Sequence, residues 1–200
     1  MSPLPKEVRL PRDLQQTLLK LARNAIVEAV CHKHLPVPGI DPHTGILAQP
    51  AGVFVTLRRA GHLRGCIGNI ESIEPLAGSV ATCAVSAALY DLRFMPVAPE
   101  EVEHLEIEIS VLSPPLPVQP EAIDVGRHGL IVKQHDICSV LLPQVASERA
   151  WTRERFLEEI CRKAGLPAEA WKNPDTQLFA FESELFREAD FQGYPPKLQG

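Results

Sequence analysis

The fold class of this 200-residue chain is indicated most clearly by one stretch, Leu105-Glu106-Ile107-Glu108-Ile109-Ser110-Val111. Apolar and polar side chains alternate in it, and successive side chains of a β-strand point to opposite faces. The pattern therefore predicts a strand with one face on a core and the other in water. Half-buried strands are typical of antiparallel or mixed sheets, whereas parallel strands are apolar on both faces. We expect Glu106 and Glu108 to form a solvated face rather than a catalytic pair of carboxylates.

The other periodic segments predict helices interleaved with strands. We expect helices where apolar residues recur at intervals of three and four, at 13–34, 75–89 and 152–164. We expect further strands at 52–57, 62–70, 129–134, 137–142 and 178–186. The sequence therefore predicts an α+β protein with an antiparallel or mixed sheet flanked by helices.

The 19 prolines gather in clusters that separate these elements. The clusters at 114–120 and 167–174 bracket two short predicted strands and a helix. We interpret 114–175 as a smaller inserted lobe. The main lobe then comprises 10–113 and 176–190, and 191–200 is a loose tail.

The composition is that of a globular protein, with 45% hydrophobic and 22% charged residues. The net charge of −5 disfavours nucleic-acid binding. The alternative of a local basic patch, formed by Arg58, Arg59 and Arg64, stays open. No apolar run is long enough to cross a membrane, and residues 1–7 lack a secretion signal. The five cysteines are scattered and odd in number, which indicates a reducing, cytoplasmic environment.

The segment Leu63-Arg64-Gly65-Cys66-Ile67-Gly68 carries the chemistry. In an extended chain His62, Arg64 and Cys66 share one face, and adjacent positive charge favours the reactive thiolate. Gly65 and Gly68 bracket the cysteine and indicate a bulge or a close backbone approach by a ligand. Their bare amides can also donate to an anion. The alternative is a buried structural cysteine.

This hexapeptide resembles the signature of the AMMECR protein family, which includes the A proteins of AmmeMemoRadiSam systems. The resemblance extends over about residues 14–188, through further blocks at 52–57, 87–94, 108–112, 126–130 and 141–151. It implies an α+β fold with a larger and a smaller lobe, in an intracellular protein. It also implies two partners, a radical-SAM protein and a Memo-like protein. The resemblance implies no particular substrate or reaction.

The residues themselves suggest a mechanism. Cys66 is the candidate nucleophile and His128 the candidate base, since cysteine catalysis uses histidines distant in sequence. Asp91 is a candidate for orienting a base, and Arg64 and Arg93 for holding a carboxylate or phosphate. The resulting hypothesis is a cysteine-dependent enzyme or covalent carrier that binds a small anionic molecule between the lobes.

Each of these roles has a structural alternative. Asp91 and Arg93 follow a helix end and can form an ion pair, and His128 can make a turn hydrogen bond. For the whole protein, the alternative is a non-catalytic binding or adaptor module that uses the hexapeptide as a groove.

Metal and cofactor sites are disfavoured. Cys31, His32, His34 and His43 are closely spaced, but they lie outside the family signature, and a helix places Cys31 and His32 on different faces. The chain has no Walker motif, dinucleotide-binding glycine run or Cys-x-x-Cys pair. It also lacks three closely spaced cysteines for an iron–sulfur cluster. We therefore expect neither a metal nor a cofactor.

Overall fold

The computed structural model describes residues 9–34 and 45–191, and the chain divides into two compact units. Among the described residues, the larger unit comprises Arg9–Val111 and 184–191, and the smaller unit is Leu112–Ser183. The second boundary, between Ser183 and Glu184, falls inside a strand. Residues 35–44 and nearly all of the tail expected at 191–200 lie outside the described residues.

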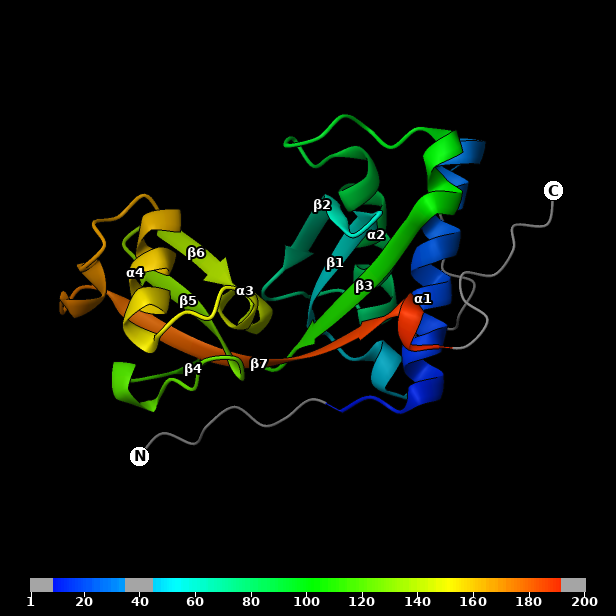
Figure 1. Cartoon of the computed structure of the whole chain (residues 1–200). Helices are drawn as coiled ribbons and strands as arrows, with labels where there is room; N and C mark the ends of the chain where they lie inside the picture. Colours follow the sequence, from blue (N-terminus) through cyan, green and yellow to red (C-terminus); the bar gives the residue numbers. More distant parts are fainter. Residues whose placement is uncertain (1–8, 35–44, 192–200) are drawn as a thin grey trace. The chain divides into compact units, whose positions relative to one another are not determined.

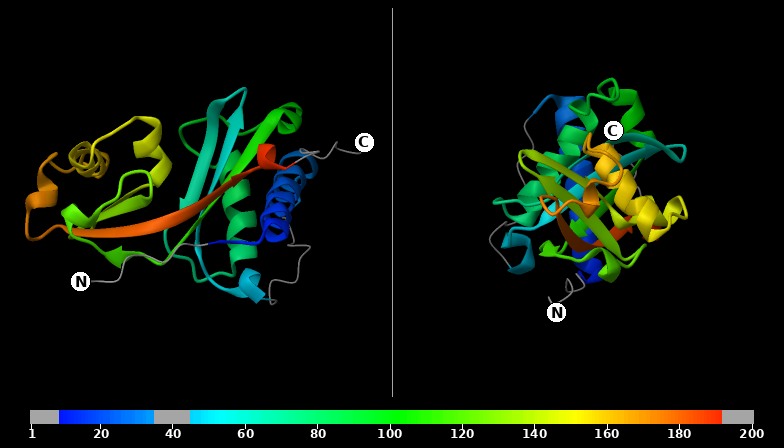
Figure 2. Two further views of the ribbon diagram at one scale, coloured as in Figure 1. Left: turned by 60° about the horizontal axis from the view of Figure 1, so that its bottom comes forward. Right: turned by 90° about the vertical axis from the view of Figure 1, so that its left-hand side faces the viewer.

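The fold is α+β, with an antiparallel sheet and flanking helices, which confirms the predicted class (Figure 1). The strands are β1 (Gly52–Arg59), β2 (His62–Asn69), β3 (Leu105–Leu112), β4 (Leu116–Pro117), β5 (His128–Gln134), β6 (Ile137–Leu141) and β7 (Gln177–Arg187). The strand order is β2-β1-β3-β7 in the larger unit and β7-β5-β6 in the smaller unit, where β4 also pairs with β7. Figure 2 shows β7 as one long strand, which contributes to both units.

Four α-helices accompany these strands in the described residues: α1 (Arg12–Val27), α2 (Leu76–Leu89), α3 (Pro143–Glu148) and α4 (Arg153–Lys163). Short helical turns are η1 (Glu28–His32), η2 (Gly45–Ala48), η3 (Pro99–His104), η4 (Pro120–Ala122), η5 (Ala170–Lys172) and η6 (Glu188–Asp190). In the larger unit, α2 packs on β1 and β2, and α1 packs beside α2 (Figure 2). None of the helices in the described part of the chain is both long and apolar enough to cross a membrane.

The first helix differs from the prediction at its C-terminal end. The α-helix ends at Val27, and a π-helical turn follows it from Glu28 to His32. Lys33 then adopts a left-handed conformation with φ 58°. The expected continuous helix over 13–34 is therefore too long. Apolar periodicity could not reveal this end because a π turn keeps the chain coiled.

A buried arginine ties α1 to the rest of the larger unit. Arg23 is 2% exposed, and its guanidinium donates to the carboxylate of Glu188 and to the carbonyls of Val102 and Leu105, both at 2.7 Å. Glu188 also accepts the backbone N–H of Ile107 at 2.9 Å. A charge pair this deep is tolerable because its hydrogen-bonding groups have partners within the unit.

The polar face of β3 is not uniformly solvated, so this part of the prediction is wrong. Glu106 is exposed, but Glu108 is only 7% exposed. Nε of Arg58 donates to Oε1 of Glu108 at 3.0 Å, and Nε of Arg187 lies 3.0 Å from the same oxygen. The strand β3 lies between β1 and β7, so side chains from both neighbouring strands cover this carboxylate.

The smaller unit has its own apolar core. Leu130 and Val132 of β5 pack with Phe156 and Ile160 of α4, and all four are fully buried. Trp151, which precedes α4, packs against the same cluster. This cluster explains the amphipathic pattern predicted for 152–164.

Candidate functional site

The β1–β2 hairpin that carries Cys66 contains a β-bulge at Arg64. Leu57 pairs with Gly65, whereas the next residue, Arg58, pairs with Leu63, so Arg64 is the extra residue. Because of this extra residue, the side chains before the bulge lie on the opposite faces from those that strict alternation with Cys66 would give. Leu63 therefore falls on the face of Cys66 and His62 on the opposite face. The expectation that His62 shares a face with Cys66 is wrong for this reason.

The two glycines of the hexapeptide are positions of close packing. A Cβ on Gly65 would lie 2.1 Å from the carbonyl oxygen of Ala87 in α2. A Cβ on Gly68 would lie 2.3 Å from the ring of Phe54 and 2.4 Å from the carbonyl oxygen of Val53. The close backbone approach expected at these positions is therefore made by the chain's own helix and strand.

The thiol of Cys66 is half-buried and has a hydroxyl neighbour. Thr56, the residue opposite Cys66 in the hairpin, donates from Oγ1 to Sγ at 3.2 Å. A hydroxyl donor stabilises a thiolate more than a thiol, because hydrogen bonds to charged acceptors are stronger. The block at 52–57 contains Thr56 but gives it no role, since only the register of the hairpin places it beside the sulfur.

Asp91 and Arg93 hold the backbone of Cys66. Oδ2 of Asp91 accepts the Cys66 N–H at 2.8 Å, and Nη2 of Arg93 donates to the Cys66 carbonyl at 3.0 Å. The two side chains also pair with each other, at 2.9 Å and 2.6 Å. The Arg93 hydrogen bonds, followed by the Cys66 N–H, lower the pKa of Asp91 to about 2 despite its burial. Asp91 therefore positions Cys66 through its backbone.

Arg64 is engaged by a carboxylate of the chain itself. Its guanidinium donates to both oxygens of Glu101, from Nε at 3.0 Å and Nη2 at 2.8 Å, while Arg59 donates to Oε1 at 2.9 Å. These contacts, chiefly with Arg64, lower the pKa of Glu101 to about 2. With Arg58 on Glu108, each arginine of the possible basic patch bonds a glutamate. Glu101 was not anticipated, because nothing in the sequence distinguishes it from Glu100.

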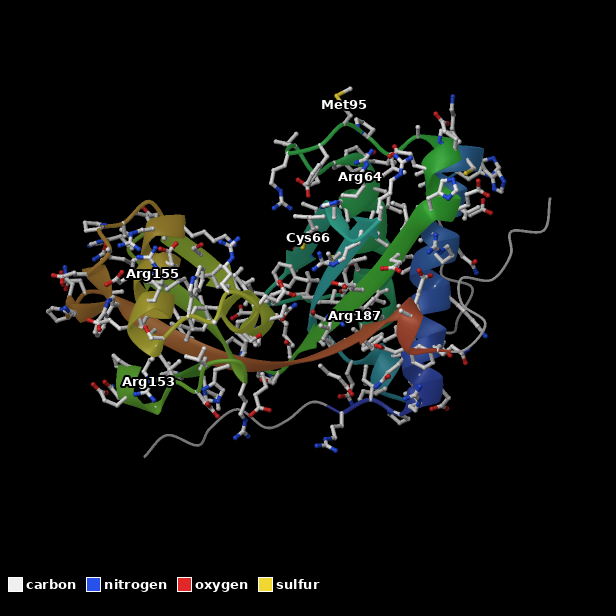
Figure 3. The ribbon with its side chains drawn as sticks, viewed as in Figure 1. Arg64, Cys66, Met95, Arg153, Arg155 and Arg187 are labelled. Carbon is white, nitrogen blue, oxygen red and sulfur yellow. The ribbon has the colours of Figure 1, made fainter. Side chains whose placement is uncertain are left out.

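The segment 90–98, which we call the edge loop, connects the end of α2 to the start of η3. Asp91 and Arg93 attach this loop to Cys66, and Arg64 makes two further bonds to it. Nη1 of Arg64 donates to the carbonyl of Met95 at 2.9 Å, and Nη2 donates to the carbonyl of Pro96 at 3.4 Å. The loop nevertheless displays apolar side chains to solvent, with exposed fractions of 67% for Tyr90, 99% for Leu92 and 80% for Met95. Figure 3 shows the Met95 side chain pointing away from the ribbon above Arg64 and Cys66.

His128 lies in the smaller unit, at the start of β5. Its Nδ1 accepts the backbone N–H of Asp124 at 3.0 Å, and its Nε2 has no hydrogen-bond partner among the described residues. Burial and the nearby Arg127 lower the pKa of His128, which favours the neutral ring. With Nδ1 as acceptor, the neutral ring carries its proton on Nε2. His128 is therefore a hydrogen-bond donor at Nε2. A general base needs a nitrogen that is available to accept a proton, so this tautomer does not suit that role.

The other four cysteines differ from Cys66 in their surroundings. Cys31 and Cys138 are exposed, while Cys83 and Cys161 are buried, and all five cysteines are free. Burial raises the pKa of Cys83 to about 11 and also raises that of Cys161.

The possible metal ligands at the end of α1 bond a glutamate instead. Nδ1 of His32 lies 3.1 Å, and Nδ1 of His34 3.5 Å, from the carboxylate oxygens of Glu28. His43 lies outside the described residues. Within residues 9–34 and 45–191, no group of three histidine, cysteine or acidic side chains is placed to hold a metal ion.

The candidate site thus comprises residues of the larger unit only, namely Cys66, Thr56, Asp91, Arg93 and the Arg64–Glu101 pair. Together with the fold, it defines an α+β protein with a half-buried cysteine fixed on an edge strand. The chain belongs to the AMMECR1 family, whose model matches residues 19–186.

Relatives and a solved structure agree with this assignment. A protein from Methanothermobacter thermautotrophicus is 43% identical over 191 residues, 92% of this chain and 98% of its own length. A protein from Thermococcus kodakarensis is 42% identical, over 90% of this chain and 93% of its own length. The crystal structure of an uncharacterized protein from Pyrococcus horikoshii superposes with a TM-score of 0.81 at 41% identity, over 86% of this chain and 89% of that chain. These comparisons establish the family and the fold.

Proposed function

We propose that Cys66 is the reactive thiol of a cysteine-dependent enzyme or covalent carrier for a small anionic molecule. One observation supports this most directly: the half-buried sulfur accepts a hydroxyl hydrogen bond while the N–H and carbonyl of the same residue are both fixed by an ion pair. A thiol held in one orientation needs less reorganisation to attack a bound carbon atom. In that step the S–C bond forms as the bond to the leaving group breaks. The leaving group departs with the electron pair and takes up the proton that the thiol releases.

Arg93 is the better candidate for contacting the anion. The Arg64 side chain is 16% exposed, and its Nε and Nη2 atoms both donate to Glu101. The Arg93 side chain is 56% exposed, so it can contact a ligand while it remains bonded to Asp91. Arginine suits this contact because its planar fork matches carboxylate and phosphate oxygens.

Protection from alkylation tests this proposal. Iodoacetamide labelling of each cysteine is followed by peptide mass spectrometry in the native protein, with and without inorganic phosphate or acetate. We expect Cys66 to label and the anions to slow its labelling, while the exposed Cys31 and Cys138 keep their rates. Arg93→Met removes the effect of the anions. The proposal fails if Cys66 labels only after the protein unfolds, because the covalent step needs an accessible thiol.

The adaptor alternative is favoured by a different observation, the exposed Tyr90, Leu92 and Met95 of the edge loop. Apolar side chains exposed to this degree are typical of a surface that binds another protein. The proposed partners, from the family resemblance, are the radical-SAM and Memo-like proteins. Under this alternative the protein co-sediments with at least one of these two purified partners. The double substitution Leu92→Ser with Met95→Ser abolishes that co-sedimentation and leaves the alkylation rate of Cys66 unchanged. Retained co-sedimentation would exclude the edge loop as the binding surface.

We further propose a cytoplasmic location. Five free cysteines, two of them exposed, suit a reducing compartment. Fluorescence microscopy of the tagged protein tests this directly.

A further inference from the structure

The strand β2 lies at the edge of the sheet, and among the described strands its neighbour is β1. An edge strand presents N–H and carbonyl groups that a further strand can bind. In an antiparallel ladder, alternate residues point both of these groups away from the neighbouring strand. Cys66 is such a residue, because its N–H and carbonyl bond Asp91 and Arg93 rather than Thr56, the residue opposite in β1.

The Asp91–Arg93 pair has the hydrogen-bonding polarity of a neighbouring strand. A residue of an added strand would accept the Cys66 N–H and donate an N–H to the Cys66 carbonyl. Oδ2 of Asp91 supplies that acceptor at 2.8 Å, and Nη2 of Arg93 supplies that donor at 3.0 Å. Their mutual ion pair fixes the acceptor and the donor relative to each other.

The protection continues toward the hairpin tip. Arg64, two residues before Cys66, is the extra residue of the bulge and binds the edge loop at Met95 and Pro96. Bulges disrupt the regular ladder that strand addition requires. The edge loop is thus fastened to β2 at both residue 64 and residue 66.

We infer that the Asp91–Arg93 pair closes the sheet edge at Cys66 and keeps β2 from pairing with β2 of a second copy of this chain. An antiparallel β2–β2 pair would place Cys66 opposite Cys66, since the N–H and carbonyl of each can bond those of the other. Without the pair, the edge loop no longer supplies either bond. This inference does not depend on the reactivity of the thiol.

The test is Asp91→Ala combined with Arg93→Met, examined by sedimentation velocity and by amide hydrogen exchange over a range of protein concentrations. We expect the parent protein to sediment as a monomer and the double variant to form dimers as the concentration rises. At low concentration the Cys66 amide of the double variant exchanges about tenfold faster or more, as expected for the loss of a hydrogen bond to a charged acceptor. At high concentration the Cys66 amide regains its protection because β2–β2 pairing satisfies it.

The control is Glu159→Ala with Arg162→Met, which removes an exposed ion pair of the same charges from α4. This variant stays monomeric. The inference is overturned if the folded double variant sediments like the parent, or if its dimer leaves the Cys66 amide unprotected. If circular dichroism shows that the double variant does not fold, Arg93→Met replaces it in the test. The inference then requires that Arg93→Met dimerises as its concentration rises and that the amides of residues 62–69 gain protection from exchange.

Discussion

At the scale of single residues, the surroundings of Cys66 explain why this cysteine is set apart. Its sulfur accepts the Thr56 hydroxyl, and its backbone is fixed by Asp91 and Arg93. The hexapeptide itself identified Cys66, Gly65 and Gly68 as candidates. Thr56 and Glu101 could not be found in the same way, because their roles depend on the register of the hairpin and on the path of the edge loop.

Replacing Thr56 tests the hydroxyl bond to the sulfur. Thr56→Val removes the donor at nearly constant volume, and we expect Cys66 alkylation by iodoacetamide to slow by roughly tenfold at neutral pH. Thr56→Ser retains the hydroxyl and keeps the rate within about twofold. Peptide mass spectrometry gives both rates. Equal rates in Thr56→Val and in the parent would show that the hydroxyl does not influence the thiol.

Gly65 tests the packing role of the hexapeptide. Gly65→Ala places a Cβ against the backbone oxygen of Ala87, so the strand and α2 must separate. We expect the free energy of unfolding to fall by about 3 kcal/mol, measured by urea denaturation. The matched control is Gly78→Ala within α2, whose added Cβ meets one side-chain oxygen at 3.9 Å. This control should gain about 0.5–1 kcal/mol from helix propensity.

At the scale of elements, the edge loop is held by two carboxylates of lowered pKa, Asp91 and Glu101, each at about 2. Their ordinary pKa values are 3.8 and 4.5. A carboxylate with a lowered pKa in the folded state adds stability above its ordinary pKa. That stability is lost as the pH falls toward 2, because protonation then removes the charge from the ion pair.

Glu101→Gln measures this contribution. The variant should melt at a lower temperature than the parent at pH 7, and the difference should shrink as the pH falls from 4.5 to 2. Differential scanning calorimetry follows both proteins. Glu106→Gln, at an exposed glutamate of β3, is the control and should melt like the parent at pH 7. A difference for Glu101→Gln that is independent of pH would contradict the electrostatic explanation.

Most strands and helices could be predicted, because their side-chain periodicity follows directly from which face meets the core. The details that shape the site could not. The bulge at Arg64 depends on the pairing with β1, and the burial of Glu108 depends on arginines from two neighbouring strands. The short helix α3 could not be predicted, because six residues carry too little periodicity.

At the scale of the whole molecule, the chain closes the larger unit with its last described residues. The prolines indicated a second lobe, but they could not show that the chain changes units within β7. After β7, Glu188 returns to bond Arg23 of α1, a contact across 165 positions of sequence. Such a contact has no local signature in the sequence.

Glu188→Gln tests the importance of this contact. The substitution leaves the buried guanidinium of Arg23 without a counter-charge, and we expect a loss of about 3–5 kcal/mol in the free energy of unfolding. Urea denaturation measures it, with the exposed Glu103→Gln as a control that changes stability by less than about 0.5 kcal/mol. A small effect of Glu188→Gln would mean that the carbonyls of Val102 and Leu105 suffice to hold the guanidinium.

The alkylation rates of all five cysteines, compared in the native protein at neutral pH, show whether Cys66 is a specialised reactive thiol. We predict that Cys66 reacts faster than Cys31 and Cys138 although it is less exposed, and that the buried Cys83 and Cys161 react slowest. Such an order would mean that the environment of Cys66, and not its accessibility, sets its reactivity. Rates that simply follow exposure, with Cys66 slower than Cys31 and Cys138, would contradict the claim that this site is built for thiol chemistry.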